Sequence, residues 1–112
     1  MKARIPGAGG DNRANMMKKI QDMQEEMARV QAEVEASEFT ATSGGGAVEV
    51  KVNGSHEILS INIKPEIVDP DDVELLSDMI VAAANEAMRK ASETMEQSMG
   101  RVTGGLNIPG IG

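Results

Sequence analysis

The chain has 112 residues, 11 basic and 18 acidic, which gives a formal charge of −7. It contains no cysteine, which excludes disulfides, zinc–thiolate sites, iron–sulfur clusters and cysteine nucleophiles. The N-terminus lacks the apolar core of a signal peptide, and no apolar run approaches the about 20 residues of a membrane span. We therefore expect a soluble protein of the cytoplasm with no membrane partner.

The positive charge is concentrated at the N-terminal end. Residues 1–14 contain one proline and three glycines with little apolar content, and they are predicted to form a flexible basic arm. Residues 1–19 hold five bases against one acid, net +4, whereas residues 20–112 are net −11. The overall acidity speaks against nucleic acid, because affinity for phosphate depends on Lys and Arg, but this distribution leaves one basic end.

An uninterrupted helix is predicted over residues 15–35, with Asn15 as its cap. Its apolar residues recur at alternating spacings of four and three, the heptad seam of a helix that lies along another helix. At about 30 Å, such a helix is too long to be covered by a chain of this size, so we expect part of it to meet a second subunit or to project from the body. The pattern leaves open whether the helix pairs with its own copy or folds onto the second helix. The seam consists of Met16, Ile20, Met23, Met27, Val30 and Val34.

Three strands follow, over residues 37–42, 48–53 and 57–63, with Ser43 and three glycines separating the first two. Val48, Val50 and Val52 alternate with polar residues, the pattern of a strand with one buried face. Asn53-Gly54 predicts a two-residue type I′ hairpin, so the strands form an antiparallel meander. In the third strand, alternation assigns Leu59, Ile61 and Ile63 to one face and Ile58, Ser60 and Asn62 to the other.

A second long helix is predicted to begin after Asp69-Pro70-Asp71-Asp72 and to end at Gly100. Residues 101–112 form a Gly-rich tail that we expect to be flexible. The fold class is therefore α+β, in the order α-β-β-β-α, with one domain over residues 15–100 in which the second helix covers the valine and isoleucine face of the sheet. A sheet of three strands leaves an edge poorly covered, which a second copy of the chain could protect.

The residues do not indicate an enzyme. His56 is the only histidine and follows the hairpin turn, the acidic loop 69–72 is explained by helix capping, and the glycines at 44–46 are not followed by the Lys-Ser or Lys-Thr of a phosphate-binding loop. We predict no catalytic residue, cofactor, metal or small-molecule substrate. Phe39 is the only aromatic residue, so recognition of bases by stacking is not expected either.

Several segments together resemble the YbaB/EbfC family of bacterial nucleoid-associated proteins, from about Gly7 to Gly110. They are the Met-rich stretch 16–24, the stretch 44–54, Asn85-Glu86-Ala87, and Gly104-Gly105-Leu106 with Pro109-Gly110. The resemblance implies a tweezer-shaped homodimer that binds double-stranded DNA with little sequence preference and helps to organise the nucleoid. The basic residues that match the DNA contacts attributed to the family are Lys18, Lys19, Arg89, Lys90 and Arg101.

Two hypotheses from different classes follow. The first is a dimeric DNA-binding protein that contacts phosphates, affects DNA conformation and gene expression, and loses affinity steeply with salt. The second is an acidic helical adaptor that binds a protein through its Met-rich seam or its apolar tail, Leu106 with Ile108 and Ile111.

Overall fold

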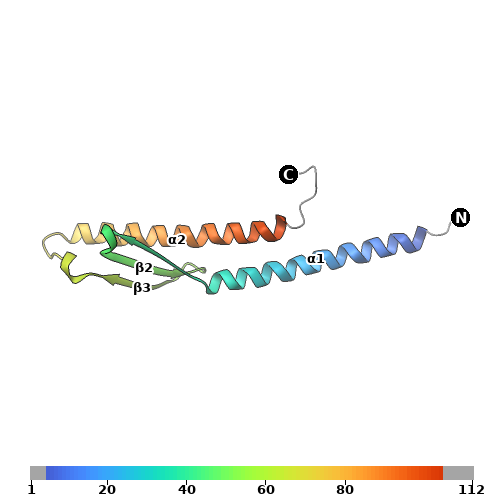
Figure 1. Cartoon of the computed structure of the whole chain (residues 1–112), viewed down its shortest axis with the longest axis horizontal. Coiled ribbons are helices and arrows are strands. Elements are labelled where there is room, and N and C mark those ends of the chain that lie inside the picture. Colours follow the sequence, from blue (N-terminus) through green and yellow to red (C-terminus); the bar gives the residue numbers. More distant parts are fainter. Residues whose placement is uncertain (1–4, 105–112) are drawn as a thin grey trace.

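The computed structural model describes residues 5–104, and side chains from residue 12 onward (Figure 1). The molecule is elongated, with Cα extents of 88 × 26 × 16 Å. The predicted order α-β-β-β-α is confirmed: the elements are α1 (Ile5–Ala36), β1 (Glu38–Ser43), β2 (Val48–Asn53), β3 (Ile58–Ile63) and α2 (Val73–Gly104), with short 3-10 turns at Gly44–Gly46 and Pro65–Ile67.

Both helices are longer than the sequence predicted. α1 begins at Ile5 rather than at Asn15, and α2 continues through Gly100 to Gly104. A glycine inside a helix costs only about 1 kcal/mol relative to alanine, which good helix formers on either side can offset, so Gly100 does not end α2. The predicted flexible arm, residues 1–14, is helical from Ile5, and its flexibility stays a prediction; residues 1–4 and most of the predicted tail lie outside the described residues.

The sheet has the predicted order β1-β2-β3, antiparallel throughout. Val48, Val50 and Val52 on the central strand are fully buried, because α2 presents small residues that allow close approach. These are Ala83, Ala87 and Ala91, spaced four apart along one face of the helix. The predicted cover by the second helix is therefore confirmed for the valines of β2, but it was wrong for β3, where Ile61 remains 41% exposed. The core of the chain lies between β2 and α2.

The hairpin between β2 and β3 is not the predicted type I′ turn. Asn53 pairs with Glu57 across a three-residue loop, and the left-handed residue is His56 (φ 66°), not Gly54. The Asn53 side chain holds the loop, since its Oδ1 accepts hydrogen bonds from the N–H groups of Ser55 (2.9 Å) and Glu57 (3.0 Å). The Asn-Gly pair thus marks a turn for a different reason: Asn53 caps it, and Gly54 lies against the backbone at the end of α1.

The register of β3 also differs from simple alternation. Lys51 pairs with Ser60 and Val52 with Ile58, so a bulge inserts Leu59 as an extra residue. Ile58, rather than Leu59, therefore shares the inner face with Ile61 and Ile63. The predicted assignment of Ile58 and Leu59 was wrong, because alternation along one strand carries no information about a bulge.

The C-terminal half of α1 runs antiparallel to the C-terminal half of α2 (Figure 1). Val34 is buried, and together with Val30 it lines a groove of 410 Å³ whose other wall includes Thr94, Ser98 and Val102 of α2. The N-terminal half of α1 continues past the end of α2, and there Met16 and Ile20 are exposed. The heptad seam of α1 is thus divided: its C-terminal half folds onto α2 of the same chain, whereas in its N-terminal half Met16 and Ile20 are covered by no other described residues.

Candidate nucleic-acid interface

Lys18 and Lys19 lie on the half of α1 that projects beyond the sheet and α2. Both side chains are exposed. Lys18 forms an ion pair with Asp22 at 3.5 Å, one turn further along the helix, with 75% of the Lys18 side chain still accessible. An exposed pair of this kind contributes little and exchanges readily for another anion. Both lysines can therefore reach a phosphate without breaking any buried contact.

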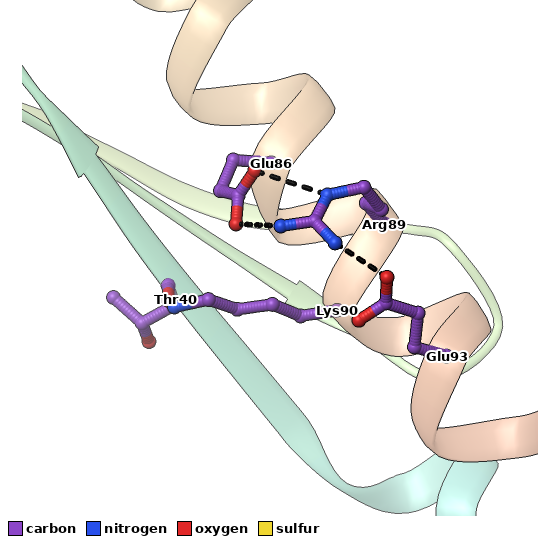
Figure 2. Close-up of polar contacts among 5 residues, drawn as sticks. All are labelled: Thr40, Glu86, Arg89, Lys90 and Glu93. Atoms are coloured by element: carbon purple, nitrogen blue, oxygen red, sulfur yellow. Dashed lines mark hydrogen bonds and ion pairs between the residues drawn. The ribbon is translucent and has the colours of Figure 1, made fainter. Parts of the chain in front are cut away.

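Arg89 is committed to two carboxylates of its own helix (Figure 2). Its Nε donates to Glu86 at 3.2 Å, one terminal nitrogen also bonds Glu86, and the other bonds Glu93. The hydrogen bond to Glu86 is the main cause that raises the pKa of Arg89. The three side chains together carry a negative charge, so this arginine is a weak attractor for phosphate where it stands.

Lys90 serves a structural contact. Its Nζ donates to the backbone carbonyl of Thr40 in β1 at 2.7 Å, and the side chain reaches from α2 across to that strand (Figure 2). The bond satisfies a carbonyl at the outer edge of the sheet and ties α2 to β1. A phosphate that recruited Lys90 would have to compete with this contact.

Arg101 lies in the last turn of α2, where a cation is favoured by the helix dipole. Its side chain is exposed and lines the groove between α1 and α2, opposite Glu26 and Glu33. Those two carboxylates already bind Arg29 of their own helix, at 2.6 Å and 2.8 Å. The hydrogen bond from Arg29 lowers the pKa of Glu26, and the hydrogen bond to Glu26 is the main cause that raises the pKa of Arg29.

The five predicted residues therefore fall into two groups. Lys18, Lys19 and Arg101 lie toward the end of the molecule where α1 projects. Lys19 is about 10 Å along α1 from Glu26, which faces Arg101 across the groove. Arg89 and Lys90 lie over the sheet, about 18 Å back along α2 from Arg101.

Sequence reasoning missed the acidic partners of Arg29 and Arg89. In both helices an arginine has a glutamate three residues before it and another four residues after it, namely Glu26-Arg29-Glu33 and Glu86-Arg89-Glu93. Residues three and four apart face each other on a helix, so this spacing was itself the signal. These pairs show that a count of basic residues on a helix overstates the positive charge that a ligand can use.

His56 contacts α2 through Ser92, with its Nε2 2.8 Å from the Ser92 hydroxyl oxygen. The contact ties the loop between β2 and β3 to the second helix and gives the only histidine a place in the fold. Among the residues that the structure describes, no three His, Cys, Asp or Glu side chains gather in a way that could hold a metal ion. Neither described helix has a stretch apolar enough to cross a membrane.

A family model, several relatives and a solved structure are similar to this chain. The YbaB/EbfC DNA-binding family matches residues 9–106. A nucleoid-associated protein of Alkaliphilus metalliredigens is 56% identical over 108 residues, which cover 96% of this chain and 95% of the relative. One of Clostridium acetobutylicum is 54% identical over 110 residues, 98% of each chain. The crystal structure of an uncharacterized protein from Helicobacter pylori shares the fold, with a TM-score of 0.58 at 23% identity over 70% of this chain and 90% of that one.

Proposed function

Since this chain belongs to the YbaB/EbfC DNA-binding family, we propose that it is a nucleoid-associated protein that binds double-stranded DNA as a homodimer with little sequence preference. Its contacts are made to phosphates, and its binding affects DNA conformation, nucleoid organisation and gene expression. The family description supports DNA as the partner, and the names of the relatives support the nucleoid as the place where the protein acts. The charges of this chain supply the mechanism.

The contact proposal depends on which basic side chains already bind a partner within the chain and which do not. Arg29 and Arg89 each bind two glutamates, and Lys90 binds a backbone carbonyl. Within residues 12–104, by contrast, no ion pair joins Lys19 or Arg101 to a carboxylate, and Lys18 has only its exposed partner Asp22. We assign the main phosphate contacts to Lys18, Lys19 and Arg101, with Arg89 and Lys90 as secondary contacts that must first leave their partners.

Low sequence preference follows from the side chains near this basic group. Reading of bases needs side chains that enter a groove or stack on exposed bases. Phe39, the only aromatic residue, is packed against the core and offers no stacking platform. Phosphate contacts carry no sequence information directly, so affinity here depends on charge and salt.

The test is a gel-shift titration of two unrelated duplexes at two salt concentrations. The variant Lys18→Glu plus Lys19→Glu is compared with Lys51→Glu plus Lys64→Glu, which makes the same change in net charge on β2 and directly after β3 rather than on the projecting helix. We expect the first variant to lose binding at both salt concentrations and the second to retain most of it, while light scattering shows the same mass for both. Each lost phosphate contact should also reduce the slope of log affinity against log salt by about 0.9.

Equal loss in both variants would mean that net charge alone, and not this group of residues, determines binding. Retention of binding in the Lys18 and Lys19 variant would move the contacts to α2 or to the terminal segments. If the wild type fails to bind either duplex at low salt, the DNA proposal is overturned for the isolated protein.

One observation favours the second candidate, an acidic adaptor for a protein partner. Met16 and Met17 are each 64% exposed, and Ile20 beside them is also exposed, on the half of α1 that projects past the end of α2. Flexible, polarisable methionines on an exposed helix suit varied partners. An adaptor would bind its partner in moderate salt and be indifferent to Lys18→Glu plus Lys19→Glu, which separates it from the DNA proposal. The apolar tail considered for this role lies outside the described residues.

A further inference from the structure

The heptad seam of α1 becomes more exposed toward its N-terminal end. Val34 is 6% exposed, whereas Ile20 is 49% and Met16 64% exposed. The seam residues between Val34 and Ile20 are half-buried. All of these residues lie on one side of the helix, because they recur at heptad spacing. The stripe is therefore apolar along its whole length, and the difference in exposure lies in what covers it.

The exposed end of the seam begins where α2 ends. Glu26 of α1 and Arg101 of α2 line the same groove, so they lie at about the same level along the two antiparallel helices. α2 extends three residues beyond Arg101, which at about 1.5 Å per residue brings its last turn level with Met23. Ile20 lies about 4.5 Å and Met16 about 10 Å farther along α1. The two exposed seam residues are therefore those that α2 is too short to reach.

The chain leaves α2 in the direction of this exposed seam. Residues 105–112 follow the described part of α2, whose C-terminal end points the same way as the projecting N-terminal half of α1 (Figure 1). An extended segment rises about 3.3 Å per residue, so Leu106 can reach about 7 Å past the end of α2 and Ile108 about 13 Å. The levels of Ile20 and Met16 lie within these distances. The segment therefore reaches both seam residues without reversing its direction.

The sequence of this segment suits an apolar stripe. Leu106 and Ile108 are two residues apart, so in an extended backbone both side chains point to one side and Asn107 points to the other. Pro109 disfavours the helical conformation at Ile108, and Gly104-Gly105 lowers the stability of a further helical turn. The segment carries no charged side chain, so its burial against methionine and isoleucine leaves no charge unpaired.

We propose that residues 105–112 dock in extended conformation on the exposed seam of α1 in the same chain, with Leu106 against Ile20 and Ile108 against Met16. The inference goes beyond the proposed function and holds whether or not the protein binds DNA. The docked segment continues the cover that α2 gives to the other end of the seam. It thereby braces the half of α1 that projects past α2.

The tether favours this segment over a separate partner. A segment joined to its site by a short flexible linker has an effective concentration of about millimolar there. Leu106 is only two residues past the end of α2, so docking closes a very short loop and costs little entropy. A separate protein would have to displace the segment from Met16 and Ile20 before it could bind them. Duplex DNA is no competitor on this stripe, because neither seam residue is a cation.

Oxidation by dilute hydrogen peroxide tests the docking, because Met16 and Met17 have the same exposure, 64%, among the described residues. Met16 lies on the seam and Met17 beside it, so a docked segment covers the first and not the second. In the wild type without DNA, we expect tandem mass spectrometry to show Met16 sulfoxide forming several-fold more slowly than Met17 sulfoxide. Leu106→Ser plus Ile108→Ser should abolish the difference, and the control Asn107→Ser should retain it, with circular dichroism to confirm the fold of each variant.

Equal oxidation rates of Met16 and Met17 in the wild type would overturn the proposal. Protection of Met16 that persists in Leu106→Ser plus Ile108→Ser would also overturn it, because some other part of the assembly would then cover the seam.

Introduced cysteines identify the copy that supplies the segment, since the chain has no cysteine of its own. Ile20→Cys plus Leu106→Cys is oxidised with copper phenanthroline and run on a non-reducing denaturing gel beside Gln21→Cys plus Leu106→Cys, whose first cysteine lies off the seam. We expect a disulfide within one chain in the first variant and much less in the second. A disulfide between two chains would overturn the assignment to the same chain, and equal yields in both variants would overturn docking on the seam. Gel shift judges DNA binding separately, so neither result depends on the proposed function.

Discussion

Gly54 is the position where the structure tolerates no side chain, and Gly54→Ala tests how the long helix is joined to the sheet. An alanine Cβ there would lie 1.9 Å from the carbonyl oxygen of Val34, 2.5 Å from its carbonyl carbon and 2.8 Å from Cα of Glu35. All three atoms are backbone, so no rotamer change relieves the clash. The reason for glycine is this close approach, since the backbone of Gly54 does not have positive φ.

The expected cost has two parts. The N–H of Gly54 donates to the carbonyls of Glu35 (3.2 Å) and Ser37 (3.1 Å), and a displaced hairpin loses this shared bond, about 1 kcal/mol. The steric displacement of well-packed backbone adds about 2 kcal/mol. The total, about 3 kcal/mol, is a large fraction of the free energy of unfolding of a typical domain, which is about 5–15 kcal/mol.

Urea unfolding at fixed protein concentration measures this cost, because association makes apparent stability depend on concentration. Gly100→Ala is the matched control: no heavy atom lies within 4 Å of its added Cβ, and alanine within a helix should stabilise by about 0.5–1 kcal/mol. A loss below about 1 kcal/mol for Gly54→Ala, or a comparable loss for Gly100→Ala, would refute the argument from close approach.

Two further substitutions test how the cations on α2 are used. Glu86→Gln plus Glu93→Gln removes both carboxylates from Arg89. In a gel-shift titration, duplex affinity at low salt should therefore rise, and the slope of log affinity against log salt should steepen by about 0.9 per copy. An equal gain in the control variant Glu66→Gln plus Glu74→Gln would assign the effect to net charge instead. Lys90→Met keeps the aliphatic stem but removes the bond to Thr40, so urea unfolding should show a loss of about 1 kcal/mol while DNA affinity stays nearly constant. A large drop in affinity without loss of stability would make Lys90 a primary phosphate contact.

Much of the fold was predictable because it depends on patterns within short stretches of the sequence. Val48, Val50 and Val52 alternate with polar residues, and the small residues of α2 recur at helical spacing, so the strand, the helix and the face that joins them all follow from periodicity. The heptad seam of α1 was equally clear. Its partner was not, because a heptad pattern is satisfied by any second helix, and only the structure shows α2 of the same chain against Val30 and Val34.

The errors arose where one residue's role depends on a distant neighbour. Asn53-Gly54 has the sequence of a type I′ turn, but Gly54 is required by the backbone of α1, some twenty residues earlier in the chain. The bulge at Leu59 depends on the pairing of two strands and has no signature in either one. At the candidate site, the bond of Lys90 to Thr40 joins residues fifty positions apart, so no local pattern indicated it.

The net charge of −7 does not argue against DNA binding once the charges are placed in space. Acidic residues gather around the start of α2, at Asp69, Asp71, Asp72, Glu74 and Asp78, whereas Arg101 lies at its other end. From Asp78 to Arg101 the helix extends about 35 Å, several times the screening length of about 8 Å at physiological salt. In the proposed complex, a duplex held by Lys18, Lys19 and Arg101 therefore lies far from these five carboxylates, while Glu26 and Glu33, across the groove from Arg101, are paired with Arg29. Lower salt lengthens the screening distance and brings the acidic end into play, so affinity should rise less steeply at very low salt than phosphate contacts alone would give.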